Sequence, residues 1–133
     1  MTAEKLVRIA LSDDELRVLV AGVNEWLGPA YCTLEMAIAM GFGNYDELES
    51  MADRLVDSLP AMSLSDTDWT RVLLATEIAF ASSAMGSGLD WSTSTGYSDE
   101  YTIRVLRQVQ KKLEPVARGV LVHTIGTRPS RSF

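Results

Sequence analysis

The chain has 133 residues, of which 47% are apolar and 23% charged, and its net charge is −6. Apolar residues are spread along the whole length, which excludes a disordered chain and fits one hydrophobic core. The single cysteine excludes an intrachain disulfide and a thiolate metal cluster, and it favours a reducing, cytoplasmic compartment. The negative charge argues against general nucleic-acid affinity, because binding phosphate groups requires cations.

Neither an export signal nor a membrane span is expected. Residues 1–11 carry Glu4, Lys5 and Arg8 among their apolar side chains, so they lack the apolar centre of a secretory signal. The longest apolar stretch, residues 72–85, is shorter than the roughly 20 residues that a membrane-spanning helix needs. We therefore expect no contact with a membrane.

Capping residues, helical spacing of apolar residues and stop signals predict five helices. The clearest start is at Ser12, because Glu15 follows it at the spacing of a capping box, and Gly28-Pro29 ends that helix. The other four starts have Thr33, Asn44, Ser65 and Ser98 as caps. The predicted helices cover residues 13–27, 33–40, 45–59, 66–85 and 99–114, the last one ending at Glu114-Pro115.

Two further segments have the composition of strands. Apolar residues alternate in 5–11, and residues 119–125 are rich in Val and Ile. These segments near the two chain ends could pair as a two-strand ribbon, although a coil or a helical extension is an alternative for either.

The two halves of the chain resemble each other. Leu11-Ser12-Asp13 reappears as Leu64-Ser65-Asp66, and apolar stripes match between residues 11–59 and 64–113. Duplication and convergence of two capped helical pairs both explain this match. We predict a mainly α fold, a compact bundle of about five helices from two similar helix-loop-helix halves, with one domain over 1–126 and a flexible tail over 127–133.

Charge is distributed unevenly along the chain. Residues 1–100 hold 17 acidic and 5 basic side chains, a net −12, whereas residues 101–133 hold 7 basic and 1 acidic, a net +6. The favoured interpretation is internal pairing, in which the acidic helix 46–57 could lie alongside the basic last helix. The alternative is two oppositely charged surfaces that face partners. The basic residues of the last helix are Arg104, Arg107, Lys111 and Lys112.

Little in the sequence points to catalysis. Cys32 and His123 are the only residues of their kinds, no metal-ligand spacing is present, and no cofactor is expected. The loop 86–96 combines glycines, hydroxyls, Asp90 and Trp91, and Trp91 could either plug the core or anchor a partner. A less favoured hypothesis makes this loop the centre of an enzyme or small-ligand site with Glu77 as general acid or base.

The leading hypothesis is a non-catalytic protein-binding module, immunity-, antitoxin- or adaptor-like, that presents acidic side chains to a basic partner protein and inhibits it. A DNA-binding regulator that uses the basic last helix is a further alternative, and a homodimer is compatible with both. The residues predicted to bind the partner are Asp46, Glu47, Glu49, Asp53, Asp90 and Trp91.

Overall fold

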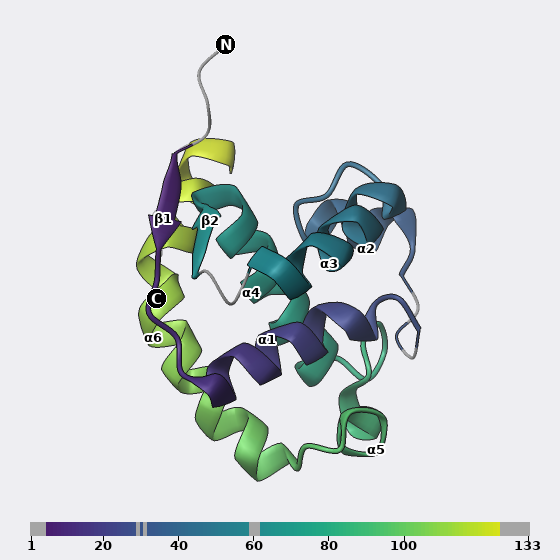
Figure 1. Cartoon of the computed structure of the whole chain (residues 1–133). Coiled ribbons are helices and arrows are strands. Elements are labelled where there is room, and N and C mark those ends of the chain that lie inside the picture. Colours follow the sequence, from purple (N-terminus) through teal and green to yellow (C-terminus); the bar gives the residue numbers. More distant parts are fainter. Residues whose placement is uncertain (1–4, 29, 31, 59–61, 126–133) are drawn as a thin grey trace, which may run out of the picture.

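The computed structural model describes residues 5–28, 30, 32–58 and 62–125 (Figure 1). The fold is mainly helical with one small antiparallel sheet, so the predicted fold class is confirmed. Its elements in chain order are β1 (Leu6–Arg8), α1 (Asp13–Glu25), α2 (Leu34–Ala39), α3 (Tyr45–Ser58), β2 (Ser63–Ser65), α4 (Asp66–Ala81), the 3-10 turn η1 (Gly88–Asp90), α5 (Trp91–Thr95) and α6 (Asp99–Ile125).

Each predicted helix cap is confirmed, so the local sequence sets where these helices start. At α1 the capping box is complete: the Ser12 amide donates to Glu15 Oε1 at 2.7 Å and the Glu15 amide donates to Ser12 Oγ at 3.2 Å. In the other four starts a side-chain oxygen likewise accepts from the amide three residues on. These caps are Thr33, Asn44, Ser65 and Ser98.

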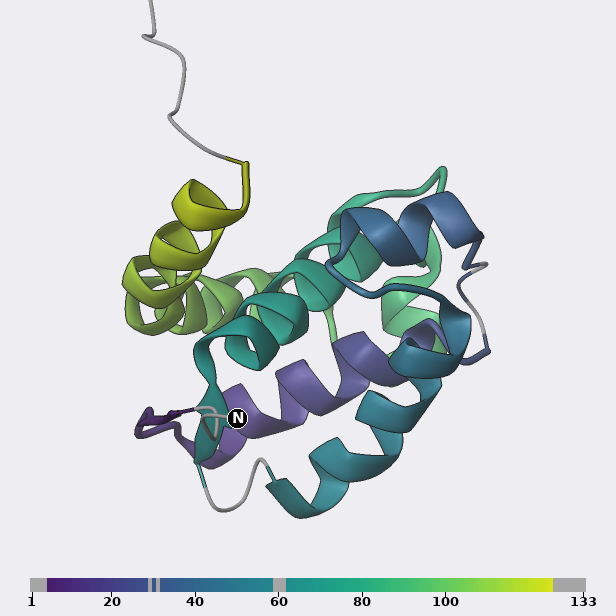
Figure 2. The same ribbon diagram turned by 90° about the horizontal axis from the view of Figure 1, so that it is seen from above.

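Helices α1 and α4 form the centre of the fold, with α6 on one side of the pair and α3 on the other (Figures 1 and 2). The α1–α4 contact is close at Gly22, where an added Cβ would lie 2.4 Å from Thr76 Oγ1. Thr76 is fully buried and its hydroxyl donates to the Val72 carbonyl, so it has little room to move. The small residue at position 22 therefore permits this packing.

Three buried tryptophans connect elements that are distant in the sequence. Each indole N–H donates a hydrogen bond of 2.8 or 2.9 Å, which satisfies the polar atom of an otherwise apolar side chain. The acceptors are Ala75 O for Trp26, Val7 O for Trp69 and Thr102 Oγ1 for Trp91. These bonds link α1 to α4, α4 to β1, and α5 to α6.

The strand partner differs from the sequence prediction. β1 does pair as an antiparallel strand, but its partner is β2, immediately before α4, with Val7 opposite Leu64. Residues 119–125 are helical and belong to α6. The ribbon of N- and C-terminal segments is therefore wrong in its second strand, because alternation of apolar residues in 5–11 gives no information about the partner.

The end of the last helix was also predicted wrongly. α6 continues through Pro115 to Ile125, although a proline inside a helix removes one backbone hydrogen bond and normally kinks or ends it. Beyond the proline, Val116 and Ala117 pack on the core, and Val120 and Leu121 line a hollow beside α4. Tertiary packing of these side chains compensates for the local cost.

The proposed duplication stays a prediction. Both halves begin with a serine-capped helix, at Ser12 and Ser65, as expected under either origin. The tail 127–133 lies outside the described residues.

Candidate interaction surfaces

The outer face of α3 carries three acidic side chains. Leu48, Met51 and Leu55 form its buried face, at the spacing of an amphipathic helix. On the opposite side are exposed carboxylates, which we call the acidic stripe of α3: Asp46, Glu49 and Asp53. The stripe spans about 10 Å, which is seven residue steps along the helix. Within the described part of the chain, none of the three makes an ion pair or side-chain hydrogen bond, so their charges face solvent.

Glu47 has a different environment from the acidic stripe. Its carboxylate accepts from the Gly43 amide at 2.9 Å and lies 3.7 Å from the Arg71 guanidinium. Arg71 also contacts Asp68 at 3.3 Å and donates to the Gly41 carbonyl at 2.8 Å. Glu47 therefore fastens the α2–α3 connection to α4, and its charge is partly neutralised.

Trp91 lies in the core. Its side chain has no exposed surface, packs edge-on against Phe80 with ring centroids 5.5 Å apart, and bonds to Thr102. Of the two roles considered for Trp91, the structure shows the one in which it fills the core. We leave it out of the interaction surface, since a partner cannot reach it in this conformation. Asp90, the residue before it, is exposed at the end of η1.

The segment 86–96 is more ordered than a loop. It contains η1 and α5, and Gly96 ends α5 in the left-handed conformation with a φ of 81°. Ser87 is buried and donates to Glu25 Oε1 at 2.6 Å. This bond fastens the start of the segment to the end of α1. The Ser87 hydroxyl therefore has a structural role.

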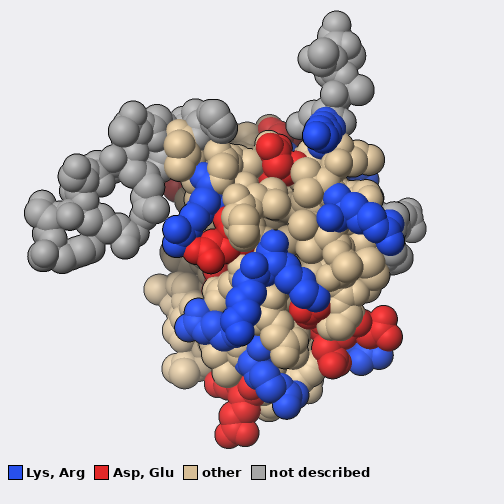
Figure 3. Space-filling view, turned by 90° about the vertical axis from the view of Figure 1, so that its left-hand side faces the viewer, with Lys and Arg blue, Asp and Glu red and all other residues tan. Residues whose placement is uncertain are grey.

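Basic side chains outnumber acidic ones on the exposed side of α6, and Figure 3 shows Lys and Arg side chains gathered over this face with Asp and Glu side chains beside them. Four exposed residues fall within an arc of about 60° on the helix. We call them the basic stripe of α6: Arg104, Arg107, Lys111 and Arg118. Because α3 lies on the other side of the α1–α4 pair, the two charged helices do not pair as the sequence suggested.

Among the described residues, one ion pair joins α6 to the acidic part of the chain. Lys112 Nζ lies 2.6 Å from Glu15 Oε1 and donates to the Ala10 carbonyl at 2.9 Å. Burial alone would raise the pKa of Glu15, but hydrogen bonds from Lys112 and from Ser12, together with the lysine charge, outweigh it and lower that pKa. Among the side chains that the structure describes, ion pairing between the two charged regions is therefore limited to this site.

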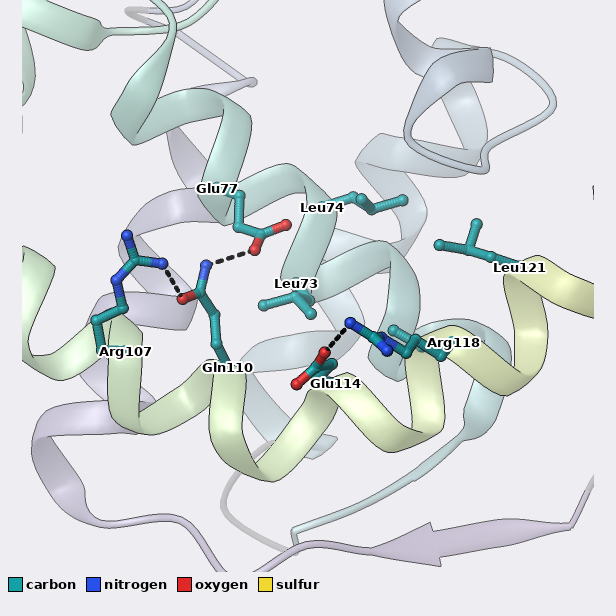
Figure 4. Close-up of a pocket in the computed structure, with 9 residues that line it drawn as sticks. Leu73, Leu74, Glu77, Arg107, Gln110, Glu114, Arg118 and Leu121 are labelled. Atoms are coloured by element: carbon teal, nitrogen blue, oxygen red, sulfur yellow. Dashed lines mark hydrogen bonds and ion pairs between the residues drawn. The ribbon is translucent and has the colours of Figure 1, made fainter. Parts of the chain in front are cut away.

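A groove of about 370 Å³ runs between α4 and α6 (Figure 4). Glu77 points into it from α4 and accepts from Gln110 Nε2 at 2.6 Å, and Gln110 in turn accepts from Arg107 at 2.7 Å. Glu114 pairs with Arg118 on the same wall. No residue of 86–96 lines this groove, so Glu77 and that segment do not form a common site there.

The surroundings of Cys32 do not activate its thiol. Cys32 is half-buried, its thiol donates to the Thr33 carbonyl at 3.5 Å, and burial raises the thiol pKa, which disfavours the nucleophilic thiolate. The side chain of His123 lies outside the described residues. Over the described ranges, no group of three or more His, Cys, Asp or Glu side chains could hold a metal ion. The helices described include none that is both long and apolar enough to cross a membrane.

Known proteins offer no guide to function, because no family model, no curated protein and no solved structure matches this chain. Inferences about function therefore depend on the chain's own surfaces.

Sequence reasoning missed three polar contacts that join distant segments. They are Lys112 with Glu15, Ser87 with Glu25, and Gln110 with Glu77. In each case a polar residue stands near the apolar stripe of its helix, which is a signal that it will be buried and paired. The identity of the partner has no signal in the sequence, because the two residues of each contact are 33 to 97 positions apart.

Proposed function

We propose that this protein is a non-catalytic binding module whose acidic stripe of α3 contacts a basic partner protein. The observation that carries the proposal is the separation of charge: Asp46, Glu49 and Asp53 face solvent, on the side of the fold opposite the basic helix α6. If internal pairing had neutralised the acidic region, no such surface would be available.

An acidic surface suits a basic partner for electrostatic reasons. Side chains of one sign on a firm helix raise the rate of encounter with an oppositely charged protein, and the effect weakens as salt increases. The acidic stripe is fixed by the buried face of α3 and by Arg71, which fastens the start of α3 to α4. The interface is therefore preorganised, which lowers the entropic cost of binding.

An inhibitory role, as in immunity proteins and antitoxins, is the form of this proposal that best fits a small chain of net charge −6. Blocking a cationic enzyme requires only a complementary surface, with no catalytic group or cofactor. A cytoplasmic location is part of the same proposal and depends on the single cysteine.

The experiment compares affinity capture by three tagged full-length chains from the native cell extract. The first is the natural chain, the second carries Glu49→Lys with Asp53→Lys, and the matched control carries Asp13→Lys with Glu100→Lys, which changes the net charge equally. Circular dichroism checks that all three fold. We expect the natural and control chains to retain the same basic protein at about 50 mM salt and the stripe variant to retain at least tenfold less.

Either of two results would contradict the proposal. One is equal retention of the basic protein by the stripe variant and the control. The other is retention that does not weaken between about 50 mM and 500 mM salt, because an interface steered by exposed charges must be sensitive to screening. Retention of duplex DNA by the natural chain at low salt, with no basic protein, would favour the DNA-binding alternative.

A further inference from the structure

We propose that the groove between α4 and α6 binds an acidic amphipathic helix of a second partner protein. The site is independent of the acidic stripe, because α6 and α3 lie on opposite sides of the α1–α4 pair (Figures 1 and 2). With both surfaces occupied, the protein would connect a basic partner to an acidic one.

The floor of the groove is apolar and extends beyond a single hollow. Leu73, Leu74, Ala117 and Leu121 provide its apolar surface beneath the polar rim (Figure 4). Leu74 and Leu121 also line a second hollow of about 370 Å³, which reaches Ile38 of α2. Ile38 is 55% exposed, a large value for an isoleucine beside a hollow. The two hollows share Leu74 and Leu121 and therefore lie next to each other along α4.

The free charge on the α6 side of the groove is positive. There Glu114 and Arg118 pair with each other and cancel, whereas Arg107 bonds to the neutral Gln110 and keeps its charge. Glu77 also bonds to Gln110, so its negative charge stays on the α4 side. The basic stripe of α6 borders the groove on its outer side, and it includes the lining residues Arg107 and Arg118. Lys111 makes no ion pair within the described part of the chain. An occupant that carries carboxylates along the flank facing α6 would complement this rim.

A helix fits the groove better than an extended peptide or DNA. The lining residues of α4 run from Thr67 to Glu77, about 15 Å, which corresponds to about ten residues of an occupying helix. Apolar residues at positions i, i+3, i+4 and i+7 of such a helix would enter the two hollows. DNA offers phosphates for the basic stripe but nothing apolar for the floor, so the observations favour the peptide.

The probe is a fluorescein-labelled synthetic helix of about 14 residues, with leucines at helical spacing and glutamates along one flank. A matched peptide has lysine in place of each glutamate. Fluorescence anisotropy with the full-length chain at about 50 mM salt measures both affinities. We expect micromolar binding of the acidic peptide and at least tenfold weaker binding of the basic one.

Two pairs of variants locate the binding site. Leu74→Gln removes apolar floor, and Leu89→Gln is its control, because Leu89 is 85% exposed and lines neither hollow. We expect about tenfold weaker binding for the first and no change for the second. The double variant R107E/K111E should likewise weaken binding about tenfold, whereas R17E/R54E, which reverses two exposed arginines elsewhere, should not.

Methyl NMR locates the binding site on the natural chain, so this test does not depend on the stability of any variant. In the natural chain, the acidic peptide should shift the methyl signals of Leu74 and Leu121. The proposal is overturned by shifts confined to Leu34 or Leu89, by equal affinity for both peptides, or by no binding at about 1 mM peptide. It is also overturned if a duplex of about 20 base pairs binds the natural chain but not R107E/K111E, while the acidic peptide binds neither. The E49K/D53K variant should bind the peptide normally. Failure of the groove proposal can therefore be distinguished from failure of the proposed function.

Discussion

The ion pair between Lys112 and Glu15 offers the sharpest test of how the basic and acidic parts of the chain are joined. Replacing Lys112 by Met keeps the apolar stem but removes the ammonium group that contacts Glu15 Oε1 at 2.6 Å and the Ala10 carbonyl at 2.9 Å. The Glu15 side chain is only 2% exposed. Its carboxylate would then keep its hydrogen bonding to Ser12 but lose its charged partner.

The loss in unfolding free energy expected for Lys112→Met lies between two limits. Removing one partner of a fully buried ion pair costs about 3–5 kcal/mol, whereas an exposed pair contributes about 0–1 kcal/mol. Because the Lys112 side chain is 40% exposed while that of Glu15 is buried, we expect a loss of about 2 kcal/mol in the free energy of unfolding. At this chain length that corresponds to a fall of about 8 °C in Tm.

Urea denaturation followed by circular dichroism measures the effect at pH 7, with Lys111→Met as the matched control. Lys111 is exposed and has no ion pair with any described residue, so its replacement should change stability by less than about 0.5 kcal/mol. Equal unfolding free energies for the two variants would refute the reasoning.

The pH dependence of the same measurement has a defined sign. The folded pKa of Glu15 is lowered from its ordinary value of 4.5, so the unfolded chain binds this proton more readily than the folded one. The natural chain therefore has this stabilisation in full above about pH 4.5 and loses it as the pH falls through the lower, folded pKa. The gap between the natural chain and Lys112→Met should narrow over that range, and a constant gap down to about pH 3 would rule out an electrostatic origin.

Three further substitutions test the packing, each by urea denaturation. Gly22→Ala places a Cβ 2.4 Å from Thr76 Oγ1 and should cost about 1–3 kcal/mol through overpacking. Gly119→Ala should instead stabilise the fold by about 0.5–1 kcal/mol, because alanine favours a helix more than glycine does. Nothing lies within 4 Å of the new Cβ, so the added methyl group meets no clash. Trp91→Phe leaves the buried Thr102 hydroxyl without its 2.8 Å contact and should cost about 2 kcal/mol, with circular dichroism showing the same helical content.

Local signals were the reliable part of the sequence prediction. Side-chain caps act within three residues, so the starts at Ser12 and Ser65 could be predicted without knowledge of the fold. The end at Pro115 could not, because packing of the following turns outweighs the helix-breaking tendency of proline. The partner of β1 was missed for a related reason, since a strand pattern in one segment contains no information about a strand 57 residues away.

The sequence also predicted one part of the candidate surfaces and missed another. The acidic stripe of α3 could be predicted, because solvent-facing positions follow from the helical spacing of Leu48, Met51 and Leu55. Glu47 and Trp91 were placed on the same surface, but one is tied to Arg71 and the other is buried. An aromatic residue in a polar segment is compatible with either the core or an interface. Only the residues that surround it in the folded structure determine which of the two it occupies.

The sequence by itself determined the helical class, the helix starts and the uneven distribution of charge along the chain, because these depend on residue type and short-range spacing. Only the tertiary structure decided whether the opposite charges meet. Packing of α1 on α4 separates α3 from α6 and leaves Lys112 and Glu15 as the ion pair between the described charged regions. Packing of α6 on α4 creates the groove in which Glu77 lies. Burial of apolar faces contributes more free energy to this packing than exposed ion pairs do, so it sets the helix arrangement, and the exposed charges follow it.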